Sequence, residues 1–556
     1  MFILLLSSCQ EQERSLFTEL PSNETQIYFS NDFVESEDLN IVEYLYAYNG
    51  GGVGIGDINN DGLPDIYFTA NQLPNKLYLN KGGLIFEDIT ETADVAGLSG
   101  PNSWSTGVTM ADVNGDGYLD IYLSVVSGYK QLQGHNQLFI NNGDLTFTEA
   151  SKDFGLNVVG FCQQGYFFDY DLDGDLDLYQ LRHAVHKSEV YADAANRKIR
   201  DSLSGDLLFK NEKNKFIDVS EVSSIYGGSA GYGLAAGVAD FDNNGCPDIY
   251  VSNDFHENDF LYFNNCDGTF TERGTESMGH TSRFSMGNDI ADINNDGWLD
   301  IFTADMKPFN EVIRKKSVPE ASPEIYDFRL SFGYQNQYSR NMLQLNRGLL
   351  FATGTQFSEV GQQADIQATD WSWAPLMADL DNDGWKDLFI TNGIRHRPND
   401  LDYINFAYND NAKIFLNQEL VDFMPDGAVH NFAFKNNVKL GFIDVSKKWG
   451  LEYKGYSMGA SYGDLDNDGD LDLVINNLNE KASVYENNSQ ERFKNNYLSV
   501  KLIGPPKNRF GIGAKVVVQT DDNIQTLELN PSRGWLSSTD YSLHFGLGKN
   551  KKITSV

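Results

Sequence analysis

Cysteine is scarce in this chain, which has four of them in 556 residues. That number is too small for a disulfide framework, so the fold must rest on a hydrophobic core. Cys246 and Cys266 could pair with each other, and Cys162 has no evident partner. Cys9 stands apart, directly after a short apolar run at the start of the chain.

Basic residues are also few, with 42 Lys and Arg against 79 Asp and Glu, which gives a net charge of −37. A surface of this sign repels phosphate backbones and anionic lipid headgroups, so we expect no nucleic-acid partner. Divalent cations are the natural partners of so many carboxylates. Hydrophobic residues still make up 41% of the chain, which excludes a disordered acidic segment.

Long apolar runs are missing, and none after the first few residues approaches the 18 needed to span a bilayer. Residues 1–9 end in Leu-Ser-Ser-Cys and resemble a bacterial lipobox, in which the Cys is lipidated. They have no positive n-region, which leaves a clipped start with a chance cysteine as the alternative. We expect a lipoprotein-type signal over 1–9, lipidation of Cys9 and a tether over 10–25. The protein would then be extracytoplasmic, as a bacterial outer-membrane or cell-surface lipoprotein that meets the membrane only through its lipid anchor.

Proline is sparse, with 14 residues, whereas the 51 glycines are typical of the many tight turns of an all-β protein. Some of these glycines belong to a nine-residue pattern, D-x-[DN]-x-[DN]-G-x-x-D, which occurs seven times. An apolar segment precedes each copy and a short apolar strand follows it. A third segment comes next, as in residues 76–80, and a turn rich in Asn and Gly leads to a fourth, as in residues 86–90.

Four short strands per repeat describe an antiparallel blade, and blades bury their faces by stacking around an axis. We therefore predict an all-β fold, a seven-bladed β-propeller with calcium loops over residues 26–490, followed by a partial small β domain over 491–556. The seventh repeat lacks a fourth strand, and residues 26–30 are strand-like without a blade of their own. We expect these residues to complete the seventh blade and close the ring.

The repeated loops offer the oxygen ligands that calcium prefers. Positions one and nine are always Asp, positions three and five are Asp or Asn, and position six is always Gly, as a turn with positive φ requires. Position seven varies so widely that only its backbone carbonyl can be the shared ligand, and the Asp at position nine suits bidentate binding. EF-hands and dockerin repeats begin alike, but position twelve here is never Glu and lies in a β-like run.

We expect up to seven calcium ions in a structural role, because crowded carboxylates need a counter-ion that metal-free Asx turns would lack. The expected ligands of loops one to four are Asp57, Asn59, Asp61, Leu63, Asp65; Asp112, Asn114, Asp116, Tyr118, Asp120; Asp169, Asp171, Asp173, Asp175, Asp177; and Asp240, Asp242, Asn244, Cys246, Asp248. Those of loops five to seven are Asp292, Asn294, Asp296, Trp298, Asp300; Asp379, Asp381, Asp383, Trp385, Asp387; and Asp464, Asp466, Asp468, Asp470, Asp472. Loops three, six and seven carry the most aspartates, so we expect them to hold calcium most tightly.

These repeats resemble the FG-GAP/VCBS repeats of the integrin alpha-subunit propeller and of bacterial propeller proteins. Residues 496–502, 511–516 and 544–548 look like the ASPIC/UnbV domain, which follows such propellers in the cartilage acidic protein family and in many bacterial lipoproteins. That pattern stops at Val556 partway through. The resemblance implies that ligand contacts lie on the face opposite the calcium loops, as they do in integrin-like propellers.

Three long insertions, at about 181–205, 305–340 and 395–430, each follow the strand that leaves a calcium loop. Antiparallel strands alternate in direction, so the insertions gather at the opposite face, where aromatic residues enter the first strands. We expect a recognition surface there; the alternative is that these residues merely plug the ring. The candidate ligand-surface residues are Trp104, Tyr232, Trp371, Trp373, Arg395, Arg397, Asp400 and Asp402.

The expected function is binding of a protein or glycan ligand at that face, in adhesion or partner binding at the cell envelope, and not catalysis. The G-x-S-x-G match at 455–459 precedes a strand and a calcium loop instead of a helix, and no Ser/His/Asp set is legible. His183 and His186 have no evident third ligand for a metal. The alternatives are a glycan-binding or polysaccharide-processing accessory protein, similar to lyase propellers, and a purely structural spacer.

Overall fold

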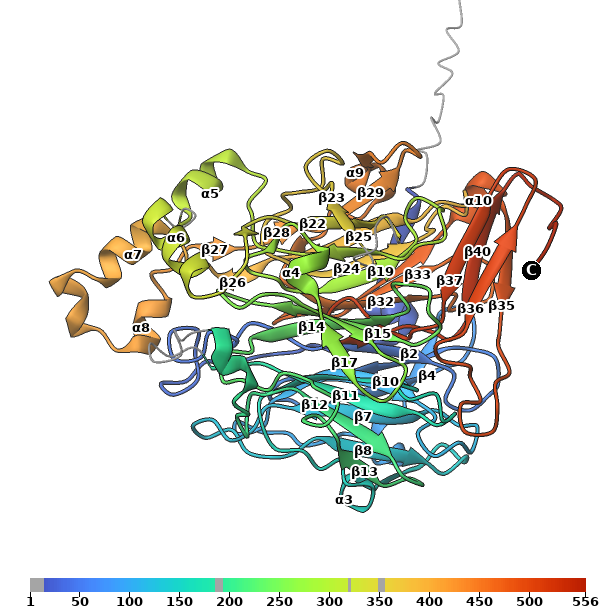
Figure 1. Ribbon diagram of the computed structural model, residues 1–556, viewed down its shortest axis with the longest axis horizontal. Helices are drawn as coiled ribbons and strands as arrows, with labels where there is room; N and C mark the ends of the chain where they lie inside the picture. Colours follow the sequence, from blue (N-terminus) through green and yellow to red (C-terminus); the bar gives the residue numbers. More distant parts are fainter. Residues whose placement is uncertain (1–14, 186–193, 319–321, 349–355) are drawn as a thin grey trace, which may run out of the picture.

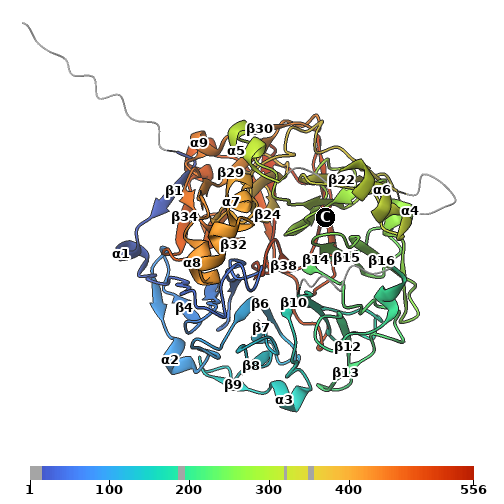
Figure 2. The same cartoon turned by 90° about the vertical axis from the view of Figure 1, so that its left-hand side faces the viewer.

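The computed structural model describes residues 15–185, 194–318, 322–348 and 356–556, and its strands form seven four-stranded blades around one axis (Figures 1 and 2). The first strands of neighbouring blades contact one another around the axis. Blades one to three are β2 (Val53–Gly56), β3 (Asp65–Phe68), β4 (Lys76–Asn80), β5 (Phe86–Asp88); β6 (Ser105–Ala111), β7 (Asp120–Val125), β8 (Gln137–Asn141), β9 (Phe147–Glu149); and β10 (Cys162–Phe168), β11 (Asp177–Arg182), β12 (Leu207–Asn211), β13 (Phe216–Asp218). Blades four and five are β14 (Gly233–Ala239), β15 (Asp248–Asn253), β16 (Phe260–Asn264), β17 (Phe270–Glu272); and β19 (Asn288–Ala291), β20 (Asp300–Thr303), β22 (Met342–Asn346), β23 (Phe357–Glu359). Blades six and seven are β24 (Ser372–Ala378), β25 (Asp387–Asn392), β29 (Phe432–Asn436), β30 (Phe442–Asp444); and β32 (Ser457–Gly463), β33 (Asp472–Asn477), β34 (Ser483–Asn487), β1 (Phe17–Leu20).

The core lies between the blades, which is why the second strands do not alternate between apolar and polar residues. All residues of β3, β7, β11 and β15 are buried, because each strand has a neighbouring blade on both faces. Their tyrosines bury the ring and pair the hydroxyl: Tyr67 donates to the Val95 carbonyl at 2.6 Å, and Tyr250 donates to Asp259 at 2.6 Å. The sequence-based prediction of a seven-bladed all-β propeller is confirmed.

The ring closes through β1, and the prediction that residues 26–30 complete the seventh blade is wrong. β1 pairs antiparallel with β34, with Phe17 opposite Asn487. Residues 26–30 follow a one-turn helix, α1 (Ser22–Thr25), and form no strand of the seventh blade, although the Phe29 carbonyl accepts the Ala482 N–H at 3.0 Å. The Phe29 ring stacks on Phe68 of the first blade at 4.7 Å, so the segment lies between the last and first blades. The alternating burial of Ile27 and Phe29 imitates a strand, because both side chains point into the same inter-blade core.

One-turn helices follow the fourth strands of several blades, and longer helices occur in the insertions. The former are α2 (Thr90–Ala93), α3 (Ser151–Phe154), α4 (Gly274–Ser277) and α9 (Ser446–Trp449), while α10 (Ser489–Phe493) follows β34. The insertions contain η2 (Ala194–Lys198), α5 (Glu311–Lys316), α6 (Pro323–Ser331), α7 (Leu401–Ala407), η3 (Asp410–Ile414) and α8 (Asn417–Val421). Short strand pairs in the same regions are β18 (Thr281–Ser282) with β21 (Gln337–Tyr338), β26 (Ile394–His396) with β27 (Asp426–Gly427), and β28 (Val429–His430) with β31 (Lys454–Gly455).

The insertion helices α5, α6, α7 and α8 lie at one end of the propeller, and we call this end the insertion face (Figure 1). The C-terminal domain, residues 496–556, stands at the other end, over the seven repeated loops, and we call that end the loop face. Its strands are β35 (Asn496–Val500), β36 (Lys515–Gln519), β37 (Ile524–Glu528), β38 (Ser532–Arg533), β39 (Ser537–Ser538) and β40 (Leu543–Gly548).

The C-terminal domain is not a separate appendage, because part of it enters the propeller. Residues 531–539, which we call the axial hairpin, run into the middle of the ring, where β39 pairs with β2 of the first blade (Figure 2). Gly52 is required for this approach, since a Cβ atom there would lie 1.7 Å from the Leu536 carbonyl oxygen. The hairpin thus joins the domain to the innermost strands of the propeller.

Among the residues that the structure describes, no helix is long and apolar enough to cross a membrane.

Candidate metal centres and the opposite face

The seven repeated loops connect the first and second strands of their blades, so all of them lie on the loop face. The glycine at position six has φ between 86° and 95° in every loop, which confirms the prediction of a left-handed turn there. The carboxylate at position one accepts the backbone N–H of this glycine, as Asp379 does from Gly384 at 2.8 Å. In most loops its other oxygen accepts the N–H of position five, so the loop wraps around the first aspartate.

The aspartate at position nine is buried in every loop. One of its oxygens accepts the N–H of position two and the other accepts the N–H of the last residue of the third strand, as Asp472 does from Leu465 at 3.0 Å and Asn487 at 2.9 Å. Burial raises the pKa of Asp65 and Asp177 to about 8. A carboxylate held this deep needs a cation close by to remain ionised at neutral pH. Each oxygen keeps a second lone pair for a metal, so the backbone bonds position the group without using it up.

Four of the seven loops bring three carboxylates together, with oxygens within 4.8 Å of one another. The groups are Asp169, Asp171, Asp177; Asp240, Asp242, Asp248; Asp379, Asp381, Asp387; and Asp464, Asp466, Asp468. Position three explains the difference, because it is Asp in these four loops and Asn in loops one, two and five. In those three loops the Asn side chain donates to the aspartate at position five, at 2.9, 2.8 and 2.9 Å.

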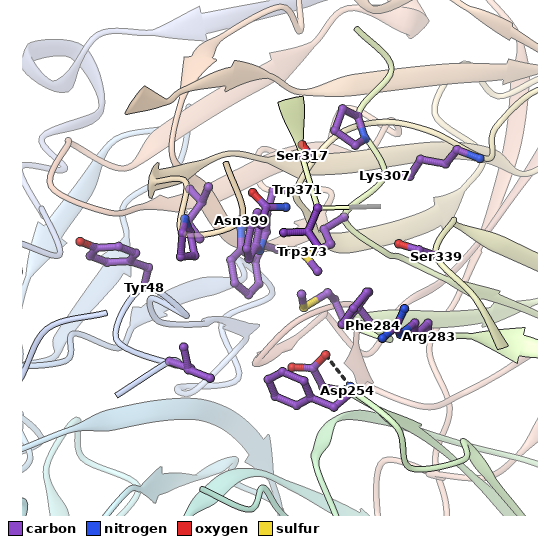
Figure 3. A pocket seen from close by; sticks show the side chains of 18 of the residues that line it. Tyr48, Asp254, Arg283, Phe284, Lys307, Ser317, Ser339, Trp371, Trp373 and Asn399 are labelled. Atoms are coloured by element: carbon purple, nitrogen blue, oxygen red, sulfur yellow. Dashed lines mark hydrogen bonds between the residues drawn. The ribbon is translucent and has the colours of Figure 1, made fainter. Parts of the chain in front are cut away.

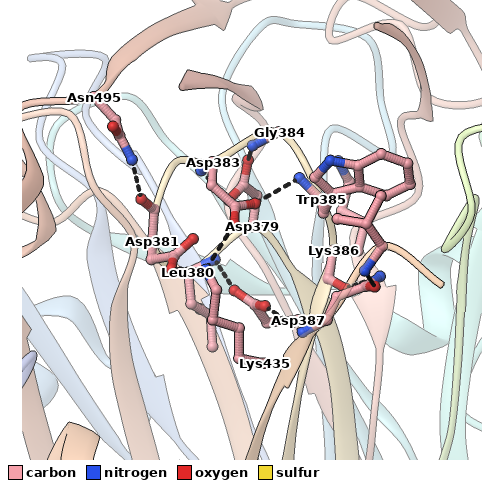
Figure 4. Close-up of polar contacts among 12 residues, drawn as sticks. Asp379, Leu380, Asp381, Asp383, Gly384, Trp385, Lys386, Asp387, Lys435 and Asn495 are labelled. Atoms are coloured by element: carbon pink, nitrogen blue, oxygen red, sulfur yellow. Dashed lines mark hydrogen bonds and ion pairs between the residues drawn. The ribbon is translucent and has the colours of Figure 1, made fainter. Parts of the chain in front are cut away.

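Loops three, six and seven also hold buried carboxylate oxygens that have no hydrogen-bond partner. These oxygens are Oδ1 of Asp169, Asp171, Asp175, Asp381, Asp464 and Asp470. Unpaired buried oxygens are costly, and hard oxygen ligands converging on one point are what Ca²⁺ binds. The residues therefore fit a calcium ion. Loop six illustrates the arrangement, with Asp379, Asp381 and Asp387 grouped together and Asp383 beside them (Figure 4).

Lysines lie against three of the four carboxylate groups. Lys210 of β12 contacts Asp171 in loop three, Lys435 of β29 contacts Asp381 and Asp383 in loop six, and Lys515 of β36 lies 3.4 Å from Asp240 in loop four. Within the described part of the chain, no ion pair to a lysine or arginine is formed by the loop-seven aspartates. Glu486 occupies the β34 position that corresponds to Lys210 and Lys435. Burial raises the pKa of Asp464 to about 7 and that of Asp470 to about 8. Loop seven is thus the loop whose charge most needs an ion.

An asparagine that was not predicted to have a role ends every third strand and links neighbouring loops through hydrogen bonds. The seven residues are Asn80, Asn141, Asn211, Asn264, Asn346, Asn436 and Asn487. Each donates its side-chain amide to the carbonyl at position eight of its own loop, and six of them also donate to the position-two carbonyl of the preceding blade, as Asn141 does to Ile58 at 2.8 Å. The signal was visible as an invariant Asn at the end of the third segment.

The C-terminal domain covers the repeated loops of the propeller. Lys507 pairs with Asp175 at 2.7 Å, and Arg509 donates to the Gly115 carbonyl at 2.6 Å. Asn523 donates to the Gly384 carbonyl at 3.1 Å. The Tyr497 ring covers Gly469, where a Cβ atom would lie 2.0 Å from the ring. The loop face is therefore largely an internal interface of this chain.

The insertion face contains a cavity of about 560 Å³ at the end of the ring axis. Trp371 and Trp373 line it, together with residues of the second and third insertions such as Met306, Ser317 and Asn399 (Figure 3). Two of the eight expected ligand-surface residues thus meet at one site.

Trp104 and Tyr232 are not part of any surface, because both side chains are fully buried. The Trp104 ring packs edge-on against Phe33, and the Tyr232 ring packs against Phe255. The N-terminal segment 33–48 runs across this end of the ring and buries Trp104. Sequence position alone could not reveal this cover.

The four charged candidates serve mainly structural contacts. Arg397 forms a buried ion pair with Asp370 at 2.7 Å, and Asp400 caps α7 by accepting the N–H groups of Asp402 and Tyr403. Asp402 pairs with Lys316 at 3.1 Å, and Arg395 is half-buried. Replacing 395–402 would therefore disturb the fold.

The remaining candidates have simple structural roles or lie outside the described residues. Cys246 and Cys266 form a disulfide that links loop four to the turn after β16, and Cys162 is free and buried. His183 is fully buried beside the Tyr44 hydroxyl at 2.9 Å, and burial lowers its pKa to about 3. Cys9 and His186 lie outside the described residues.

Comparison with known proteins agrees with this architecture. The FG-GAP-like repeat family matches residues 57–123 and 240–303, and the ASPIC and UnbV family matches residues 504–556. Cartilage acidic protein 1 of Xenopus tropicalis is 22% identical over 525 residues, which cover 90% of this chain and 68% of that protein. The human protein of the same name is 23% identical over 522 residues, covering 90% of this chain and 67% of its own length.

Among solved structures, an Agrocybe aegerita lectin aligns with 90% of this chain and all of its own, at 15% identity and a TM-score of 0.39. Its title describes recognition of non-reducing terminal N-acetylglucosamine by that lectin. The sequence matches and the blade topology together lead to one conclusion. This chain is a seven-bladed β-propeller that carries FG-GAP-like repeats and an ASPIC and UnbV domain, and it is homologous to cartilage acidic protein 1.

Proposed function

We propose that this protein is a calcium-binding, extracytoplasmic propeller that binds a ligand or partner in the cavity of its insertion face. The observation that carries the proposal is the cavity itself, about 560 Å³ in volume and lined by residues from several blades and insertions. A mostly apolar cavity with a few polar groups is the usual form of a small-molecule or side-chain binding site. Calcium at the opposite end would hold the blades in register and keep this site rigid.

The difference between the covered loop face and the insertion face supports this proposal. The loop face is covered by the C-terminal domain, whose Lys507 and Asn523 bond to the loops, so little of it is open to a partner. The insertion face is built from three insertions, and recognition residues commonly lie on such loops above a rigid scaffold. Adhesion or partner binding at the cell envelope fits a protein of this kind.

Binding is favoured over catalysis by the composition of the cavity. Asp254 is the one carboxylate among its described lining residues, so a pair of acidic groups for acid–base work is lacking there. Trp371 and Trp373 are 8% and 2% exposed, so neither offers the open ring face on which a sugar would stack. A glycan-processing role therefore has less support than ligand binding.

A pair of leucine variants tests the cavity as the binding site. Leu45 lines the cavity and is 40% exposed, whereas Leu73 is 39% exposed and does not line it. A protein or small-molecule partner would first be identified in a screen with calcium present. Leu45→Asp should weaken the binding of that partner by about tenfold or more, because it puts a charge on an apolar wall. Leu73→Asp should leave that binding unchanged, and both variants should keep the wild-type melting temperature. Equal effects of the two variants on affinity would place the partner elsewhere.

The envelope location has its own test. If Cys9 carries a lipid, Cys9→Ser should move the protein from the membrane fraction to the soluble fraction, because the acyl chains supply the membrane affinity. Cys162→Ser is the matched control, since that thiol is buried in the propeller. Unchanged fractionation of the Cys9 variant would exclude the lipid anchor.

A further inference from the structure

The cavity on the insertion face has mostly apolar walls but contains one unusual polar group. Its walls include Leu45, Phe255, Phe284, Met306, Trp371 and Ile394. Arg283 lies among them, half-buried, with its guanidinium 4.8 Å from the centre of the Phe284 ring. Its Nε is buried and has no hydrogen-bond partner, and no ion pair to Arg283 is formed by the described residues. A guanidinium kept in this state normally has a partner, because leaving its donors unpaired costs free energy.

The charge around the cavity is opposite to that of the whole chain. Its lining residues include Arg283, Lys307 and Arg314 but one carboxylate, Asp254, although the chain carries a net charge of −37. Asp254 already accepts the Phe255 N–H at 2.7 Å and the Tyr46 hydroxyl at 3.4 Å. The charges of Asp254 and Arg283 act on each other, but the described residues form no hydrogen bond between the two side chains, so the Nε donor of Arg283 stays without a partner.

The positions of these groups divide the cavity into two parts. Figure 3 shows Arg283, Phe284 and Ser339 on one side and Trp371 and Trp373 on the other. Lys307 also lines the cavity, but its side chain extends away from Trp373 (Figure 3). A ligand can therefore put one charged group at Arg283 while its body lies along the apolar walls of the cavity.

We infer that this cavity takes an amphipathic monoanion, a molecule with an apolar alkyl or aryl body and a single acidic group held by Arg283. This inference rests on the proposed function, since it names the ligand class of the same cavity. The acidic group would accept hydrogen bonds from the guanidinium N–H groups and form a charge-assisted pair with them. Such a pair is stronger where water is excluded. The volume of about 560 Å³ is of the size that holds a small ligand of this kind.

Two fluorescent probes separate the two parts of the inference. Anilinonaphthalene sulfonate has an aromatic body and one anionic group, and phenylnaphthylamine has the same body without the charge. Titrated into the full chain with calcium present, both should bind with one equivalent, and the sulfonate should bind about tenfold more tightly. Leu45→Asp should weaken both probes, which would place them in the cavity.

Arg283→Met then tests the cation while keeping an apolar side chain of similar length. We expect it to weaken the sulfonate by about tenfold and to change the neutral probe by less than about twofold. Arg273→Met is the matched control, because Arg273 is also half-buried over an aromatic ring, at 5.7 Å from Phe263, but lies outside the cavity. It should change neither probe.

The possible failures are distinguishable. If both probes bind in the cavity equally well and Arg283→Met changes neither, the cavity binds ligands but the acidic group is wrong. If neither probe binds with defined stoichiometry, or if Leu45→Asp leaves both unchanged, the cavity is not the binding site and the proposed function fails with it. If Arg283→Met loses the folded state, its melting temperature will be lowered. In that case Arg283→Lys, which keeps the charge, replaces it as the test and should retain the preference for the sulfonate.

Discussion

Removal of calcium should lower the melting temperature of this protein by about 10 °C. An ion at a hundredfold excess over its Kd contributes about 2.7 kcal/mol to the stability of the folded state, and several loops would contribute together. The physical reason is that carboxylates crowded within one loop, such as Asp379 and Asp381 of loop six, repel one another when no cation balances them. Differential scanning calorimetry in calcium and in EGTA measures the shift directly.

The loop-seven variant Asp466→Asn/Asp468→Asn should change the stability of the protein in opposite directions with and without calcium. With calcium present the variant should be less stable than the wild type, because it has lost two charged ligands. In EGTA it should be as stable as the wild type or more so, because it has also lost two like charges. Asp521→Asn/Asp522→Asn removes two exposed aspartates outside the repeated loops and should be neutral in both conditions. A variant that is destabilised equally with and without calcium would show that these aspartates act only through hydrogen bonds.

Trp535→Ala should destabilise the protein by about 3–5 kcal/mol, as removal of a fully buried tryptophan does. Trp535 is at the tip of the axial hairpin, where its ring lies 4.9 Å from that of Trp373 and its Nε1 donates to the Asn49 carbonyl at 2.9 Å. Its loss leaves a hole at the axis and weakens the link between the C-terminal domain and the propeller. Thermal unfolding measures the cost, and limited proteolysis should show faster cleavage in the C-terminal domain.

Trp298→Ala is the matched control, since Trp298 is half-buried in loop five. It should cost clearly less than Trp535→Ala and should not expose the C-terminal domain to protease. An unchanged melting temperature and an unchanged digestion pattern in Trp535→Ala would mean that the hairpin does not hold the domain in place. The same contact explains why Trp373 cannot be a pure ligand residue, as its ring supports the hairpin.

The propeller could be predicted from sequence because its physical cause is local and repeated. Each loop places Asp, Gly and Asp at fixed positions, and each copy alone specifies a turn between two strands. Seven copies then fix the number of blades without any knowledge of long-range contacts. Gly62 and Gly469 have φ of 93° and 94°, as the repeat requires.

Contacts between distant parts of the chain could not be predicted in the same way. Phe17 and Ile27 lie in segments of similar strand-like character, and the choice between them depends on how the N-terminal segment reaches β34. The burial of Trp104 depends on Phe33, and the place of Trp535 depends on a hairpin that pairs with β2. No periodicity within a single segment carries this information.

The same distinction between local repeats and long-range contacts applies to the candidate sites. The candidate metal ligands follow from the repeat. The structure adds the unpaired oxygens of Asp464 and Asp470 and the lysines beside the other acidic groups. The cavity is formed by residues as distant as Leu45, Arg283 and Asn399, which share no pattern in the sequence. Trp371 and Trp373 are the two of the eight candidate ligand-surface residues that line this cavity.

The most direct test of the calcium proposal is native mass spectrometry of the full chain with graded chelator. We predict up to seven bound calcium ions in excess calcium, with those of loops three, six and seven retained longest and loop seven the last to be lost. Asp466→Asn/Asp468→Asn should remove the most tightly held ion. A protein that binds no calcium at any concentration, or one in which loops one and two retain their ions longest, would contradict the account.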